Sequence, residues 1–199
     1  MTNELWNQAY TEKTPDQRSW TQPEAHDSLS LIRESHVCKD AAIIDIGGGA
    51  SLLVDALIED GYTDVTLLDI ASAALTETEV RIGNKASYLC ADITLWTPER
   101  TYAVWHDRAV FHFLTTPEQH DAYLNAFLTG TESSSHLIIA TFAPTGPESC
   151  SGLPVQRWSQ QDLARFFEPH CEVISTFETT HTTPWGSTQP FTWLHARRK

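Results

Sequence analysis

The sequence predicts an α/β fold in which a mostly parallel sheet of seven strands carries helices on both faces. From residue 41 onward, short apolar runs alternate with amphipathic stretches, as in successive β-α units. The last two apolar runs are separated only by residues 178–190, too few for the crossover helix that parallel neighbours need. We therefore expect five parallel β-α units followed by an antiparallel hairpin that closes the sheet.

The first half of this pattern is the most regular. The first strand is expected at residues 41–46 and is stopped by Gly47, Gly48 and Gly49. A helix follows and ends at Gly61, with one apolar face made by Leu52, Leu53, Ala56 and Leu57. The second strand is expected at 65–68 with its helix around 71–82, and the third at 87–90.

The second half supplies the remaining strands. The fourth is expected at residues 102–106, and a helix begins near Pro117 with Tyr123, Leu124, Phe127 and Leu128 spaced for a core face. The fifth strand is expected at 136–142 and a further helix at 160–167. The closing hairpin is expected to pair residues 172–177 with 191–196.

Length and composition bound the organisation. At 199 residues the chain is expected to be one domain, with a core at 41–199 and an N-terminal cap segment at 1–40. The cap segment contains Trp6, Tyr10 and Trp20 but little strand character, and we expect one or two helices laid over the end of the sheet.

The net charge of −13 disfavours binding to DNA or RNA, because phosphate backbones attract positive surfaces. The one basic run, Arg197-Arg198-Lys199, is expected to be a solvated tail. No apolar run has the length of a membrane helix and no leader opens the chain, which favours a cytoplasmic protein without a membrane partner. The four cysteines are expected to be reduced and show no metal-binding spacing, so no metal is expected.

Polar residues mark the carboxyl ends of the first three strands, where open α/β sheets bind ligands. The glycine turn lets a ligand approach the backbone closely. Asp69 is placed to accept from ribose hydroxyls, and Asp92 from an adenine amino group. Each feature alone is also typical of an ordinary turn, strand terminus or helix cap. Together they predict an adenosine-containing ligand.

The ligand is not expected to be a dinucleotide, because Leu52 occupies the position of the third glycine in the G-x-G-x-x-G fingerprint. Instead, Asp45-Ile46-Gly47-Gly48-Gly49 resembles the first motif of the class I S-adenosylmethionine-dependent methyltransferases, whose Rossmann-like sheet also ends in an antiparallel strand. The resemblance implies S-adenosyl-L-methionine as cofactor. It implies a cofactor site built from Asp45, Gly47, Gly48, Gly49, Ser51 (in place of the usual third glycine), Asp69, Ile70, Asp92 and Ile93.

The prefix W-N-Q-A-Y…S-W resembles the opening of the methyltransferase branch that includes thiopurine-type and several protein-lysine enzymes. In that branch the prefix packs over the cofactor. By this resemblance Tyr10 and Trp20 are expected to touch the methionine end of the cofactor or the substrate. The structural alternative is that both residues only anchor an N-terminal helix.

The end of the fourth strand, W-H-D-R-A-V-F-H-F-L, is dense in titratable residues. By resemblance Asp107 borders the transferable methyl group and is the first candidate for a catalytic or positioning residue. His112 and His106 are candidate bases, and each is also compatible with a buried structural histidine. Arg108 is a candidate substrate-binding residue, with a structural ion pair to Asp107 as the alternative.

Two loops are expected to border the substrate. The loop after the fifth strand is long and rich in proline, and the hairpin loop carries His181 and Trp185, which are expected to wall the substrate pocket. A proline-rich turn with an exposed tryptophan is the alternative.

These observations favour methyl transfer to a small-molecule acceptor by in-line displacement. A protein-lysine methyltransferase acting on a basic protein partner is the first alternative, and a non-catalytic S-adenosylmethionine-binding module is the second. No N-P-P-[YF] motif follows the fourth strand, which argues against amino-group methylation of adenine, cytosine or glutamine by that mechanism.

Overall fold

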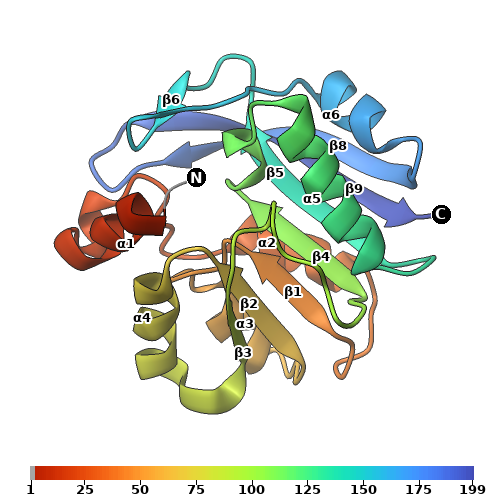
Figure 1. Cartoon of the computed structure of the whole chain (residues 1–199), viewed down its shortest axis with the longest axis horizontal. Coiled ribbons are helices and arrows are strands. Elements are labelled where there is room, and N and C mark those ends of the chain that lie inside the picture. Colours follow the sequence, from red (N-terminus) through yellow and green to blue (C-terminus); the bar gives the residue numbers. More distant parts are fainter. Residues whose placement is uncertain (1–2) are drawn as a thin grey trace.

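In the computed structural model, which describes residues 3–199, seven strands form one sheet in the order β3-β2-β1-β4-β5-β9-β8 (Figure 1). The first five strands run parallel, whereas β9 is antiparallel to both β5 and β8. The strands are β1 (Ile43–Ile46), β2 (Val65–Asp69), β3 (Ser87–Cys90), β4 (Val104–Arg108), β5 (His136–Phe142), β8 (Cys171–Thr182) and β9 (Thr188–Arg198).

Helices cover both faces of this sheet (Figure 1). One face packs against the helices of the first half of the chain, and the other against the later two. The helices are α1 (Asn3–Glu12), α2 (His26–Glu34), α3 (Leu53–Glu59), α4 (Ser72–Ile82), α5 (Pro117–Thr129) and α6 (Gln160–Phe167). Short 3₁₀ turns lie at Pro15–Gln17, Gly83–Lys85 and Phe111–Phe113.

Strand alternation explains the two cores. In β1, Ile43 faces the core beneath α2, α3 and α4, whereas Ile44 faces the core beneath α5 and α6. Both residues are fully buried, as expected of a parallel strand covered on both sides. Capping residues begin the later helices: the side chain of Thr116 caps α5 and that of Ser159 caps α6.

The expected fold is confirmed, including the antiparallel closing hairpin. Several details differ. β1 begins at Ile43, not at residue 41, and Arg197 and Arg198 belong to β9 and not to a solvated tail, because they pair with β8. The stretch between β3 and β4 contains no helix, so the third β-α unit is incomplete. β4 begins at Val104, not at residue 102, because the Tyr102 backbone N–H is held by the Gly130 carbonyl outside the strand. β8 and β9 extend past the expected apolar runs, since the polar residues around His181 also pair across the hairpin.

The loop after β5 holds a feature that the sequence analysis did not predict. Its two short strands, β6 (Ser149–Cys150) and β7 (Leu153–Pro154), form a separate two-stranded sheet. The positive φ of Ser151 and of Gly152 gives the tight turn between them.

The N-terminal cap segment folds as α1 and α2, in line with the expectation of one or two helices. In Figure 1, α1 lies beside α4 at the carboxyl end of the parallel strands. The ring of Trp6 packs edge-on against Phe113, 5.1 Å between centroids, which ties α1 to the turn after β4. Among residues 3–199, no helix is long and apolar enough to cross a membrane.

Candidate functional site

A cavity of about 410 Å³ lies at the carboxyl ends of the parallel strands. Strand order reverses between β1 and β4, and this is the point where open α/β sheets bind ligands. The cavity is lined by the ends of β1, β2, β4 and β5, by residues 91–93 after β3, and by the start of β9. Trp6, Tyr10, Arg18 and Trp20 of the cap segment line it as well.

The glycine turn after β1 needs its glycines for steric reasons. A Cβ atom on Gly48 would lie 2.6 Å from both a carboxylate oxygen of Asp45 and Cδ2 of Leu67. One on Gly49, which has a φ of +33°, would lie 2.6 Å from a carboxylate oxygen of Asp69. The turn is thus pressed against its neighbours. Gly47 and Gly48 line the cavity near the amino end of α3, and their backbone N–H groups donate to the carbonyls of Leu68 and Asp45.

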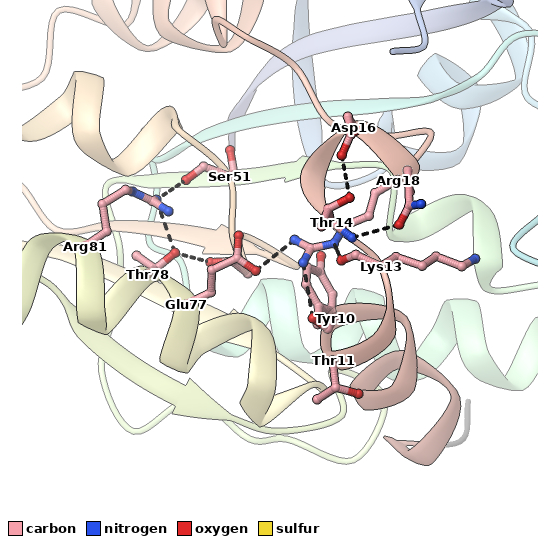
Figure 2. A network of polar contacts seen from close by, with 12 residues as sticks. Tyr10, Thr11, Lys13, Thr14, Asp16, Arg18, Ser51, Glu77, Thr78 and Arg81 are labelled. Atoms are coloured by element: carbon pink, nitrogen blue, oxygen red, sulfur yellow. Dashed lines mark hydrogen bonds and ion pairs between the residues drawn. The ribbon is translucent and has the colours of Figure 1, made fainter. Parts of the chain in front are cut away.

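The turn is also held from α4. The Thr78 hydroxyl donates to the Gly49 carbonyl at 2.7 Å, and Arg81 donates to the Ser51 carbonyl at 2.8 Å (Figure 2). The Ser51 hydroxyl accepts from the Leu53 N–H at the start of α3. Leu52 lines the cavity where the dinucleotide fingerprint has a glycine.

Asp69 ends β2 as a buried carboxylate on the cavity wall. One of its oxygens accepts from the Ala71 N–H at 2.8 Å. Burial raises the pKa of Asp69 to about 7, and the nearby charge of Asp45 acts in the same direction. A ligand that donates hydrogen bonds to this carboxylate would compensate for its lost hydration.

The residues after β3 form the neighbouring wall. One oxygen of Asp92 accepts from the backbone N–H and from the hydroxyl of Thr94, at 2.9 Å and 2.7 Å. This orders the turn that carries Ile93, a buried residue that also lines the cavity. Asp92 and Ile93 therefore lie together on the cavity wall, after the strand that pairs with β2. Ile70 lines the same part of the cavity.

A buried polar chain joins β1, β4 and α2. The Nδ1 atom of His106 lies 2.6 Å from a carboxylate oxygen of Asp45, and its Nε2 atom lies 2.8 Å from the Ser28 hydroxyl. All three residues are buried and all three line the cavity. Both ring nitrogens of His106 are engaged, so its geometry is that of a positioning residue held between Asp45 and Ser28.

Asp107 is turned away from the cavity. Its fully buried carboxylate accepts from the backbone N–H groups of Val110 and Phe111, and from the Tyr123 hydroxyl at 2.8 Å. Burial raises the pKa of Asp107 to about 6. The carboxylate thus holds the turn after β4, in which Ala109 adopts a φ of +74°.

That turn presents His112 to the cavity. The Phe142 N–H donates to His112 Nδ1 at 3.3 Å, which leaves the ring proton on Nε2 in the neutral tautomer. Burial, together with the charge of Arg108, lowers the pKa of His112 to about 3. The ring stacks on Phe142 with 4.4 Å between centroids. His112 is therefore a hydrogen-bond donor in this geometry and is poorly suited to be a base.

Arg108 follows on the same strand and reaches the same part of the cavity. Its guanidinium lies over the Phe191 ring at 4.7 Å and donates to the Trp20 carbonyl at 3.2 Å. Within residues 3–199 it forms no ion pair, so the expected alternative of a structural pair with Asp107 is absent there.

The cap segment closes the cavity through two aromatic residues that the sequence analysis singled out. Trp20 Nε1 donates to the Tyr10 hydroxyl at 3.1 Å, and both rings line the cavity. Burial raises the pKa of Tyr10, as does the nearby charge of Asp69. Trp20 also packs against Trp6.

Arg18 anchors this cap. It donates to the carbonyls of Lys13 and Tyr10 and pairs with Glu77 of α4 at 2.8 Å (Figure 2). The Arg18 side chain is buried, and its guanidinium lies 4.5 Å from the centre of the Tyr10 ring.

The two hairpin residues lie further out. His181 Nε2 contacts the Ser19 carbonyl at 2.7 Å and the ring packs against Phe191, so His181 fixes the cap segment beside the cavity. Trp185 lies in the exposed turn between β8 and β9 and is not among the described residues that line the cavity.

Comparison with known proteins identifies the fold. No protein-family model matches the sequence. The structure of a 1,6-didemethyltoxoflavin-N1-methyltransferase from Burkholderia thailandensis, with S-adenosylhomocysteine bound, superposes with a TM-score of 0.76 over 99% of this chain and 87% of that one, at 16% identity. The N-methyltransferase NodS from Bradyrhizobium japonicum WM9, also with S-adenosylhomocysteine, gives 0.71 over 100% and 99%, at 11% identity. The chain has the class I methyltransferase fold.

One curated protein also matches in sequence, the tRNA threonylcarbamoyladenosine dehydratase of Haemophilus influenzae. It is 30% identical over 107 residues, which is 50% of this chain. The match spans 37% of that protein's own length.

Within the class I methyltransferase fold, most of the expected site residues meet at one cavity. Among the described residues, the expected site residues that do not line it are Gly49, Asp107, His181 and Trp185. The sequence did not single out Ser28, Arg18, Phe142 and Phe191, which the cavity brings together from α2, the loop after α1, β5 and β9. Trp6, which also lines the cavity, is the first residue of the W-x-x-x-Y pattern, and this pattern was the sequence signal for it. Within residues 3–199, no group of three or more His, Cys, Asp or Glu is placed to hold a metal ion.

Proposed function

We propose that this protein is an S-adenosyl-L-methionine-dependent methyltransferase that acts on a small-molecule acceptor. The observation that carries the proposal is the single cavity in which the glycine turn, Asp69 and the Asp92–Ile93 pair meet at the switch point of a class I methyltransferase fold.

The residues present fit this cofactor. Asp69 would be the buried acceptor for the ribose hydroxyls, Asp92 and Ile93 would lie beside the adenine, and the glycine turn would hold the methionine part. Any Cβ on Gly48 would clash with Asp45 and Leu67, so the close backbone approach requires glycine. When bound, the cofactor supplies a methyl group on a sulfonium for in-line displacement.

The protein's own residues provide alignment and exclusion of water. Tyr10, Trp6 and Trp20 cover the cavity from the cap segment, while the chain from Asp45 through His106 to Ser28 fixes its floor. Positioning of this kind supplies much of the rate enhancement in a displacement that needs little covalent help.

A small acceptor is favoured because the cap segment, the β6–β7 loop and the hairpin close around the cavity. A basic protein substrate stays the first alternative, supported by the net charge of −13. The matching curated protein is named for an activity on tRNA, but the same negative charge disfavours a nucleic-acid substrate here. A cytoplasmic location is supported by four free cysteines.

The deciding experiment is calorimetric titration with S-adenosylhomocysteine and, separately, NAD. We expect micromolar binding of S-adenosylhomocysteine and loss of that binding in Asp69→Ala, because the buried acceptor for the ribose is removed. Asp64→Ala is the matched control, since Asp64 precedes β2 at the opposite edge of the sheet and pairs with Arg100.

Binding of NAD alone, or equal affinities in Asp69→Ala and the wild type, would contradict the proposed cofactor site. With binding established, mass spectrometry of small acceptors and of basic proteins separates the two substrate classes. Tight binding without transfer to either class would favour a non-catalytic S-adenosylmethionine-binding module.

A further inference from the structure

The cavity carries hydrogen-bond donors that have no acceptor. Seven buried side-chain nitrogen or oxygen atoms within residues 3–199 have no hydrogen-bond partner, and three belong to residues that line the cavity. All three are donors: Nε1 of Trp6, Nη2 of Arg108 and Nε2 of His112. Buried polar groups are rarely left unpaired in proteins, so their gathering at one cavity indicates a ligand rich in acceptors.

These donors belong to one part of the cavity. Phe113 packs against both Trp6 and His112, with ring centroids 5.1 Å and 4.5 Å away. Phe191 packs against His112 and lies under the guanidinium of Arg108. The donors are therefore linked through shared aromatic neighbours, and these neighbours, Phe113 and Phe191, are apolar and line the cavity.

Arg108 differs from the other arginines that line the cavity. Arg18 is paired with Glu77 and Arg81 with Asp55, each at 2.8 Å. Among the described residues, Arg108 has no carboxylate within ion-pair distance. Burial lowers the pKa of Arg108 to about 10, so the side chain is still cationic at neutral pH. The carboxylates of Asp27 and Asp45 stabilise its charge only from beyond ion-pair distance, so the guanidinium is free to pair with a ligand.

We propose that this part of the cavity binds a small acceptor molecule that carries a negative charge on a flat apolar body, with Arg108, His112 and Trp6 as its donors. The inference rests on the proposed function, because it assigns these residues to the acceptor and leaves the glycine turn and Asp69 to the cofactor. The neutral His112 ring contributes its Nε2–H, since the backbone N–H of Phe142 occupies the other nitrogen.

The test uses benzoate and benzamide, which have nearly the same shape and differ in charge. Each is titrated into protein saturated with S-adenosylhomocysteine, and the tryptophan fluorescence is followed because Trp6 and Trp20 line the cavity. We expect benzoate to bind about tenfold or more tightly than benzamide, as a charge-assisted hydrogen bond predicts. Equal binding of the two probes, or binding of neither, would overturn the proposal.

Variants locate the charge. Arg108→Gln should remove the preference for benzoate, and Arg108→Lys should retain part of it. His112→Phe should weaken the binding of benzoate without strengthening the binding of benzamide. Arg165→Gln is the control, because Arg165 is exposed on α6 and pairs only with Asp162 among the described residues. If Arg108→Gln does not fold, the wild-type comparison and Arg108→Lys decide the question.

The same titrations separate the acceptor from the cofactor. Arg108→Gln is expected to bind S-adenosylhomocysteine as the wild type does, and a clear loss would assign Arg108 to the cofactor and overturn the acceptor subsite. Failure of the wild type to bind S-adenosylhomocysteine would instead refute the proposed function.

Discussion

Asp69 carries the main electrostatic consequence of the site at the residue scale. A buried carboxylate whose pKa is raised to about 7 is protonated in a substantial fraction of the molecules at neutral pH. Ribose hydroxyls would donate to the ionised form and favour it, so ligand binding would lower this pKa. Binding must then displace a proton wherever the pH lies below about 7.

We therefore expect the affinity for S-adenosylhomocysteine to weaken as the pH falls below about 7, approaching tenfold per pH unit. Calorimetric titrations at several pH values between roughly 5 and 8 measure this pH dependence of the affinity. The Asp69→Asn variant is expected to bind S-adenosylhomocysteine more weakly. Its affinity should also depend much less on pH, because the asparagine side chain does not titrate. Parallel profiles for the two proteins would show that another group controls the dependence.

Neighbouring residues of one strand take different roles because their side chains alternate between the two faces. His106 and Arg108 point to the cavity, whereas Asp107 between them points to the core beneath α5 and is held by Tyr123. The alternation follows from the period of two in a strand. It gives Asp107 the role of stabilising the turn that presents His112.

At the scale of elements, the cap segment depends on the contact between α1 and α4. Arg18 pairs with Glu77 of α4 and donates to two carbonyls of the cap, and Asn7 of α1 accepts from the Ala73 N–H at the start of α4. The cap thus covers the cavity through a few polar contacts and the ring packing of Trp6.

We expect Arg18→Met to loosen the cap while the sheet stays folded. Loss of a buried charged donor should lower the free energy of cap opening by roughly 1–3 kcal/mol. Hydrogen exchange followed by mass spectrometry should show faster exchange in residues 3–24 and unchanged protection in β1 and β4. Arg165→Met is the control at an exposed pair. Unchanged exchange in the cap would mean that ring packing alone holds it closed.

For the whole molecule, one sheet serves two cores. Trp193 lies in the core beneath α2, α3 and α4, and Trp105 lies in the core beneath α5 and α6. The two residues come from strands separated by β5. Unfolding of either core would therefore expose strands that also form the other core.

The expected single domain therefore predicts one cooperative unfolding transition. In each of the variants Trp105→Phe and Trp193→Phe, the denaturant curve followed by far-ultraviolet circular dichroism should have the same midpoint as the curve followed by tryptophan fluorescence. Two separate transitions in either variant would show that the cap or one core unfolds independently.

The sequence by itself determined the order of the strands' apolar runs, the glycine turn and the acidic strand ends. These are local signals: Gly47, Gly48 and Asp69 owe their roles to backbone geometry and to position at a strand end. The sequence also predicts the closing hairpin, because the short connection at residues 178–190 leaves no room for a crossover helix.

Only the tertiary structure decided which side chains meet. The direction of Asp107 depended on which face of β4 packs beneath α5, where its carboxylate meets the Tyr123 hydroxyl. The donor role of His112 follows from the Phe142 N–H, which comes from a different strand. Ser28 and Arg18 carry no local motif, so their contacts with His106 and Glu77 arise only when distant segments pack together.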